Sequence, residues 1–428
     1  MTASSRGRRV SRVAALFAAG ALIFSACSDS KDSGGDKETT TTVEATGTPI
    51  LIGGIAGITG PSTSTPYAVD VINAWADFTN ANGGINGHPV EIDVRDSAGD
   101  PAKAMSLTTE ILAKNPVLFL LEDPSVEASL AETLAAAEVP VMGVGYNPAI
   151  WGGYIAAFKL ACSTEPKAPV SCGIPNAFPV TTGFGAVVDE QVIAAQLAGA
   201  TKLATAACAE VDSCSQAAPV FSGTAKQLGV TDLGVTKVAS NAADYTAECI
   251  DFIAKGADFI QISGQASMGV GLINSCRDQG YTGMWGASAG SVHGDLIKID
   301  DIKLVGGLNA FPWWADDPAV AEYRDAMAAA GVPEDGIADP TNTGLWSVLQ
   351  LFAKAQANLS DAPTGAETLE NMYTISNETL GGLIAPTTYT KDNVDRHRAC
   401  FWPYILENGE FSLPLGGLTV QCNPPAEG

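Results

Sequence analysis

From Pro49 onward, short β-branched runs alternate with segments whose apolar residues recur at helical spacing. The first series predicts strands at 50–55, 90–94, 117–121 and 139–144, with helices over 67–80, 102–114 and 125–137. After about residue 180 the alternation restarts with a helix over 184–197 and strands at 203–207, 230–235, 259–262 and 284–286. Strands joined through helices by short loops form right-handed crossovers and parallel sheets that are covered on both faces. The pattern therefore predicts an α/β fold with two doubly wound parallel-sheet lobes.

Length and charge narrow the range of functions. The roughly 380 residues after Pro49 exceed what a single core usually holds, which also favours two lobes. The chain has 47 acidic and 23 basic residues, a formal charge of −24. This excess argues against nucleic acid and anionic membrane surfaces as partners, and simple solubility explains it equally well.

The N-terminus has the features of an export signal. Four arginines precede an apolar run at 13–24 that is too short to span a bilayer. Phe24-Ser25-Ala26-Cys27 resembles the lipobox of bacterial lipoproteins, although leucine is more usual where Phe24 stands. We therefore predict a signal peptide at 1–26, lipidation of Cys27 as a membrane anchor, and a polar, disordered tether at 27–47. The alternative is an ordinary secretory signal with a chance cysteine.

Eight further cysteines are consistent with an exported, disulfide-bonded protein. Sequence neighbours suggest the pairs Cys162–Cys172, Cys208–Cys214, Cys249–Cys276 and Cys400–Cys422. Metal binding is disfavoured because no C-x-x-C occurs and His88, His293 and His397 are scattered, so we expect neither a metal nor a cofactor.

Three stretches together carry a family resemblance: "NANGGINGHPVEIDVRDSAGDPAKA", "AAAEVPVMGVGYNP" and "DYTAECIDFIAKGADFIQISGQASMGVG". They resemble the type I periplasmic binding proteins, above all the branched-chain amino-acid binding components of ABC transporters. The resemblance implies two lobes joined by three crossovers, with a ligand held between them. It places lobe 1 at 48–158 and 313–378, and lobe 2 at 159–312 and 379–428. A partner permease in the membrane and an extracytoplasmic location are implied as well.

In open parallel sheets, ligands bind beyond the carboxyl ends of the strands, where helix N-termini offer free N–H groups. Polar residues at those ends are the candidate ligand-binding set, although each could also be only a turn or an N-cap. The candidates are Thr63, Ser64, Glu122, Ser125, Gly145, Tyr146, Asn147, Gln265 and Ser288. The resemblance assigns Ser125 and the loop 145–147 to the ligand's carboxylate.

Ser288 has two possible meanings. Gly286-Ala287-Ser288-Ala289-Gly290 matches the G-x-S-x-G nucleophile elbow, but the following Gly294 makes a weak start for the helix that an elbow requires. In amino-acid-binding relatives an acidic residue at this strand end accepts the ligand's ammonium. Since this position is serine, either the ligand lacks an α-ammonium or another acid receives it, with Glu122 and Asp123 as candidates.

The sequence thus predicts a substrate-binding lipoprotein of an ABC importer that captures a small polar solute and is not an enzyme. The alternatives are a ligand-sensing module for a separate receptor and a serine hydrolase in which Ser288 acts with Asp395 and His397. Trp313 and Trp314 either line the mouth of the ligand site or pack at a crossover.

Overall fold

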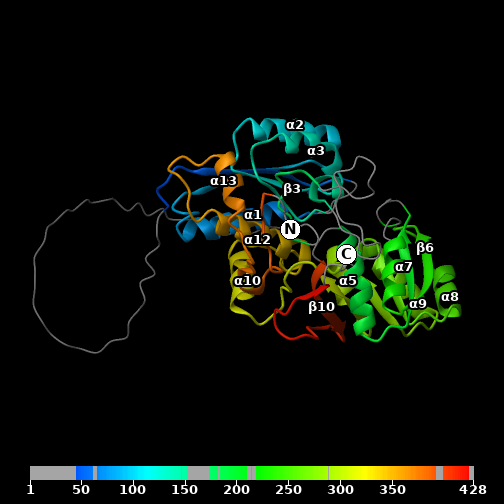
Figure 1. Cartoon of the computed structure of the whole chain (residues 1–428). Helices are drawn as coiled ribbons and strands as arrows, with labels where there is room; N and C mark the ends of the chain where they lie inside the picture. Colours follow the sequence, from blue (N-terminus) through cyan, green and yellow to red (C-terminus); the bar gives the residue numbers. More distant parts are fainter. Residues whose placement is uncertain are drawn as a thin grey trace, which may run out of the picture. The chain divides into compact units, whose positions relative to one another are not determined.

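The computed structural model describes residues 45–60, 65–145, 147–152, 173–181, 184–209, 214, 218–287, 289–391 and 399–423. These residues belong to one compact unit, which contains two β-sheets with helices packed on them (Figure 1). Within the described part of the chain, no helix is both long enough and apolar enough to cross a membrane.

The first sheet has four parallel strands in the order β2-β1-β3-β4. Its elements are β1 (Ile50–Ala56), α1 (Ala68–Ala81), β2 (Val90–Asp96), α2 (Pro101–Leu112), β3 (Leu118–Glu122), α3 (Glu127–Ala135) and β4 (Val141–Met142). All five residues of β3 are buried, as expected for an inner parallel strand that is covered on both faces. The register places Asp96, Ala56 and Glu122 in one row, so the last residues of β2, β1 and β3 share one edge.

The second sheet combines parallel and antiparallel strands in the order β11-β10-β9-β8-β7-β5-β6, with β12 also paired to β10. Its parallel part consists of β5 (Lys202–Cys208), β6 (Thr231–Val238), β7 (Phe259–Ser263), β8 (Met284–Ala287) and β9 (Lys303–Leu308). The antiparallel part consists of β10 (Ala399–Glu407), β11 (Glu410–Ser412) and β12 (Gln421–Asn423). The helices of this half are α5 (Phe184–Leu197), α7 (Ala218–Gln227), α8 (Thr246–Ala254) and α9 (Ala266–Asp278).

The chain passes between the two halves three times. After β9 it forms α10 (Pro318–Ala329), α11 (Glu334–Ile337), α12 (Pro340–Ala355) and α13 (Gly365–Met372), and it then returns to the second sheet as β10. Helices α10 and α12 pack on α1 of the first half (Figure 1), and twelve of the sixteen residues of α12 are buried. A methyl group on Gly344 of α12 would lie 2.8 Å from Val144 and 3.6 Å from Ala310, so a small residue lets two of the connecting segments approach this helix.

Asp-Pro pairs start three of the helices. Asp100, Asp317 and Asp339 each precede a proline at the first helical position and accept a hydrogen bond from a backbone N–H of the first turn. This arrangement satisfies N–H groups that would otherwise lack a partner, and proline presets the helical φ angle. A fourth pair, Asp123-Pro124, does not cap a helix, because α3 starts later with Val126 as its N-cap.

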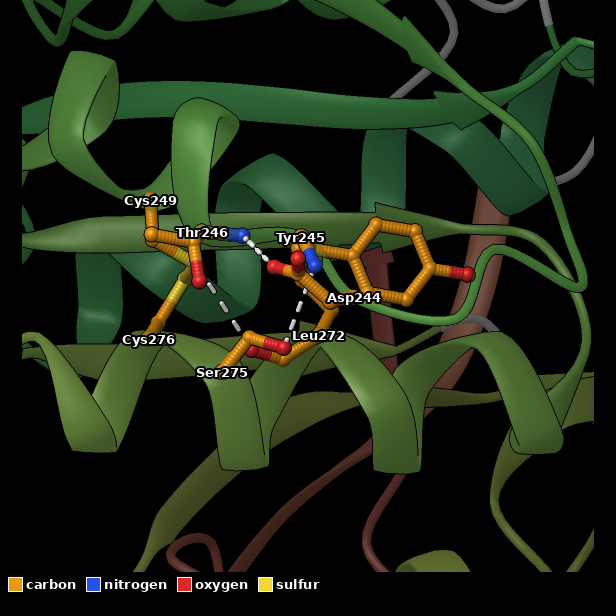
Figure 2. The surroundings of a disulfide bond; sticks show 7 residues. All are labelled: Asp244, Tyr245, Thr246, Cys249, Leu272, Ser275 and Cys276. Carbon is orange, nitrogen blue, oxygen red and sulfur yellow. Dashed lines mark hydrogen bonds between the residues drawn. A yellow bond between two sulfur atoms is a disulfide. The ribbon is translucent and has the colours of Figure 1, made fainter.

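Three of the four expected disulfides are present in the described residues: Cys208–Cys214, Cys249–Cys276 and Cys400–Cys422. Figure 2 shows that the second of these joins α8 to α9. Beside it the backbone N–H of Tyr245 donates to Ser275 Oγ at 3.2 Å, and the Tyr245 hydroxyl donates to the Ala239 carbonyl at 2.7 Å. The entry into α8 is therefore tied to α9 by covalent and polar contacts. Cys27 and the pair Cys162–Cys172 lie outside the described residues.

The predicted α/β class with parallel sheets in two lobes is confirmed, and two details differ from the prediction. The strand expected at 139–144 is only two residues long as β4. The second sheet is not purely parallel, because β10 runs antiparallel to β9. The pattern did not predict β9 to β12.

Candidate functional site

Asp96, the last residue of β2, fixes the start of the loop that follows β1. Its Oδ1 accepts the backbone N–H groups of Ile58 and Thr59, both at 3.1 Å, and its Oδ2 accepts the Thr59 hydroxyl at 2.5 Å. The predicted ligand residues Thr63 and Ser64 come later in this loop and lie outside the described residues.

Asp123 follows β3, and both oxygens of its carboxylate accept hydrogen bonds from the chain itself. It accepts the hydroxyl of Ser97, the backbone N–H of Ser125 at 3.0 Å and the Ser125 hydroxyl at 2.5 Å. Of the two acids proposed to replace the missing ammonium acceptor, Asp123 therefore has its oxygens committed. The predicted ligand residue Ser125 uses its hydroxyl hydrogen to hold Asp123.

Glu122 differs from its neighbour in having no such partners. Its side chain is 1% exposed, and neither carboxyl oxygen has a hydrogen-bond partner among the described residues. Burial raises the pKa of Glu122 well above its usual value, the nearby charge of Glu127 raises it further, and the Val144 backbone N–H opposes both. Burial therefore favours the protonated form of the Glu122 carboxyl group.

Glu127, on the first turn of α3, connects the ends of β3 and β4. One oxygen accepts the Trp151 indole N–H at 2.8 Å and the other accepts the Asn147 backbone N–H at 2.7 Å. A methyl group on Gly145 would lie 1.5 Å from Glu127 Oε1, so only glycine permits this contact. Asn147 in turn accepts the Ala149 backbone N–H at 2.9 Å and starts α4 (Pro148–Trp151), whereas Tyr146 lies outside the described residues.

In the second half, polar contacts hold the carboxyl ends of β7 and β8. The Ser291 hydroxyl donates to the Gly264 carbonyl after β7 at 2.5 Å, and the Tyr404 hydroxyl donates to the Ala287 carbonyl at the end of β8 at 3.4 Å. Gln265 is exposed at the N-cap of α9 and makes no side-chain capping bond. Its amide is therefore not committed to the helix that it precedes.

A second buried acid lies away from these strand ends. Glu190 on α5 is fully buried, and its Oε1 accepts the Gln191 side-chain N–H at 3.3 Å. Burial raises the pKa of Glu190 well above its usual value, the Gln191 hydrogen bond opposes this, and Asp189 adds to it. Gln191 also donates to the Gly307 carbonyl of β9, so this acid belongs to the packing between α5 and the sheet.

The surroundings of Ser288 do not form a nucleophile elbow. Ser288 lies outside the described residues, but β8 is followed by the three-residue 3-10 helix η2 (Ala289–Ser291) and then by η3 (Gly294–Lys298). No α-helix begins behind the serine, contrary to what an elbow requires. Asp395 and His397, the other members of the hypothetical triad, also lie outside the described residues.

The segment after Ser288 contacts the helices of the first half. Helix η2 packs on α12, and Lys298 of η3 forms an ion pair with Asp335 of α11 at 3.2 Å. The segment after β8 is therefore in direct contact with α11 and α12.

Trp313 and Trp314 at the second crossover both contact other aromatic rings. Trp313 is 7% exposed, and its ring meets Trp314 edge-on at a centroid distance of 4.6 Å. Trp314 stacks on Phe411 of β11 at 4.1 Å. Between the two alternatives left by the sequence, packing is the one observed for Trp313.

Sequence reasoning did not identify Glu127 and Trp151. Glu127 resembles an ordinary acid at a helix start, and the only available signal was its position five residues after Glu122, beyond an Asp-Pro pair. The described residues contain no group of three or more His, Cys, Asp or Glu that could hold a metal ion.

Comparisons with known proteins agree with this architecture. A family model described as "Periplasmic binding protein" matches residues 49–402. No curated protein sequence matches the chain.

Similar solved structures share the fold at low sequence identity. An extracellular ligand-binding receptor from Verminephrobacter eiseniae is 18% identical with a TM-score of 0.65, over 85% of this chain and 99% of that one. A fatty acid ABC transporter substrate-binding protein from Thermomonospora curvata is 16% identical with a TM-score of 0.64, over 88% and 94%. The branched-chain amino acid transporter substrate-binding protein of Streptococcus pneumoniae, solved with isoleucine, is 16% identical with a TM-score of 0.62, over 88% and 99%.

The family model covers the whole first sheet, the parallel strands of the second sheet and all three passages between the halves, and it ends within β10. The chain therefore belongs to the periplasmic binding protein family.

Proposed function

We propose that this protein is the solute-binding component of an ABC importer, which captures a small polar solute between its two lobes and delivers it to a permease. The observation that carries the proposal is the concentration of polar groups at the carboxyl ends of strands in both halves. Open parallel sheets bind ligands at these ends, and glycines there bring backbone N–H groups close to the ligand. Family membership supports a solute-binding role rather than an enzymatic one.

The proposed site consists of the strand-end residues predicted from the sequence. Glu122, Ser125 and the loop 145–147 belong to the first lobe, with Thr63 and Ser64, and Gln265 and Ser288 belong to the second. We propose the lobe boundaries 48–158 with 313–378, and 159–312 with 379–428. In the same scheme, residues 1–26 are removed as a signal peptide and lipidated Cys27 anchors the protein outside the cytoplasm.

Two of the similar structures were solved with, or are named for, solutes that differ in whether they contain an ammonium group. The Streptococcus pneumoniae protein was solved with isoleucine, which has an ammonium and a carboxylate, and the Thermomonospora curvata protein is named for fatty acids, which have a carboxylate alone. The proposed solute class therefore includes amino acids, amides and small carboxylates.

A thermal-unfolding screen tests the proposal. The full-length protein in detergent would be heated with amino acids, amides, carboxylates and amines, and unfolding followed by its intrinsic tryptophan fluorescence. A ligand at a hundred times its Kd adds about 2.7 kcal/mol to stability, which raises the melting temperature by several degrees. If no small solute raises the melting temperature, the proposal is wrong.

A further inference from the structure

The first lobe contains a pair of buried carboxyl groups at the carboxyl ends of β3 and β4. Glu122 ends β3 and Glu127 starts α3, and their side chains are 1% and 0% exposed. Because positions 143 and 145 are glycines, the backbone after β4 can approach these two acids closely. A methyl group at Gly143 would lie 3.1 Å from Glu122 Oε1, and the corresponding group at Gly145 would overlap Glu127.

The two acids differ in how their oxygens are satisfied. Glu127 accepts N–H donors from Asn147 and Trp151 on its two oxygens. Glu122 accepts no well-formed hydrogen bond on its side chain from the described residues, and the Val144 backbone N–H is the one donor close enough to lower its pKa, although nearly all buried polar atoms in proteins have a partner. A buried carboxyl group with two unpartnered oxygens marks a place where a donor from outside the chain is expected.

The charges around Glu122 indicate which donor fits. Glu127 places a negative charge beside it, and no Lys or Arg among the described residues forms an ion pair with Glu122. The other nearby acids are directed elsewhere, Asp123 to Ser97 and Ser125, and Asp96 to the loop after β1. A ligand carboxylate would meet this negative charge, whereas a cation would be attracted by it and would find free acceptor oxygens.

We infer that Glu122 receives the ammonium group of the bound solute and releases its own proton to the solvent when the solute binds. The inference rests on the proposed function and narrows its solute class to amines, including amino acids. The ammonium acceptor would then lie in the first lobe. An acid at the position of Ser288 would have placed it in the second lobe. The charge balances, because one ammonium enters as one proton leaves and the carboxylate pairs with the ammonium.

Proton release gives the binding a defined pH dependence. When one proton leaves per bound ligand, the association constant rises about tenfold per pH unit as long as the pH is below the pKa of the free carboxyl group. A solute bound through its carboxylate to protonated Glu122 would release no proton in this range, and its association constant would fall only above that pKa. The direction of the pH effect therefore separates the two modes of recognition.

Calorimetry on the full-length protein in detergent provides the test, with L-isoleucine and n-butylamine as amine probes. 3-Methylpentanoate and butyrate are the matched probes that lack the amine. Titrations in two buffers of equal pH and different ionisation enthalpy give the number of protons released. We expect an amine probe to bind with release of about one proton, and the variant Glu122→Gln to lose at least tenfold in affinity together with the proton release.

The variant Glu190→Gln is the matched control, because it replaces a buried acid of the other lobe whose pKa is also raised by burial. It should keep the affinity and proton release of the unmodified protein. Circular dichroism of both variants would show whether they remain folded.

Three results would overturn the inference: binding of an amine without proton release, unchanged affinity in Glu122→Gln, or binding of the amine-free probes alone. In each of these cases the proposed function would stand, because a solute still binds. If none of the amines binds while the wider thermal screen identifies another solute, only the inference fails. If that screen identifies no solute, the proposed function fails as well.

Discussion

The disulfide between α8 and α9 allows a quantitative prediction about the stability of the second lobe. Cys249 and Cys276 are 27 positions apart, both are fully buried, and their bond joins two neighbouring helices on one face of the sheet. A disulfide stabilises a fold mainly by restricting the unfolded chain, and in that description the effect grows with the logarithm of the loop length. For this spacing the expected contribution is about 3.5 kcal/mol.

Two other disulfides in the described part of the same lobe provide internal comparisons. Cys400 and Cys422 are 22 positions apart, for which about 3.4 kcal/mol is expected. Cys208 and Cys214 are only 6 positions apart, for which about 2.2 kcal/mol is expected. Removing each pair as a double alanine variant should therefore cost least at Cys208–Cys214.

Guanidinium unfolding measures these differences. Because a two-lobed protein need not unfold in a single step, circular dichroism should be accompanied by peptide-resolved hydrogen exchange of α8, α9 and β10. The loss of protection in the Cys249→Ala and Cys276→Ala double variant should be largest in α8 and α9. If removal of the short-loop pair costs as much as removal of Cys249–Cys276, then chain entropy does not explain the stabilisation.

Three further predictions concern single residues. Gly145→Ala should lower the free energy of unfolding by about 3 kcal/mol in guanidinium titrations, because the new methyl group displaces the buried Glu127 carboxylate from its donors. The control is Gly290→Ala, whose methyl group meets no atom within 4 Å and which should cost less than about 1 kcal/mol. Burial raises the pKa of Glu190 well above 4.5, so above pH 4.5 the folded protein keeps a proton that the unfolded chain loses, and stability falls as pH rises. Glu190→Gln should make this fall shallower in melting temperatures measured between about pH 5 and pH 9. Lys298→Met breaks an exposed ion pair and should lower stability only slightly at low salt and less at high salt, as a double-mutant cycle with its α11 partner would show.

The parallel strands other than β9 could be predicted because buried parallel strands are continuous apolar runs bounded by turns. β9 and the antiparallel strands were missed for local reasons. β9 contains Gly306-Gly307, and β10 contains Pro403, both of which weaken a strand pattern. In the structure β12 pairs with 399–401 and β11 with 405–407, so Pro403 lies in a stretch that pairs with β9 alone. A residue without an N–H is tolerated there, and only the tertiary arrangement reveals the reason.

The candidate site was predictable in its location but not in its contacts. Glycine and polar residues after each strand indicate the carboxyl ends of the sheets, and the structure places Glu122, Ser125 and Asn147 there. The sequence could not distinguish the roles of Glu122 and Asp123, because both are acids at the same strand end and a sequence does not show which groups each of them contacts. Only the hydrogen bonds from Ser97 and Ser125 show that Asp123 is committed.

The two buried acids with raised pKa values illustrate why burial alone does not identify a site. Burying a carboxyl group costs free energy unless it is hydrogen-bonded, and such costs tend to remain where function requires them. Glu190 accepts a hydrogen bond from Gln191 and lies between α5 and the second sheet, so packing accounts for it. Glu122 has no partner among the described residues and ends a strand at the sheet edge where ligands bind in this architecture. The difference in position and partners, rather than the shared pKa shift, is what makes Glu122 the residue to test first.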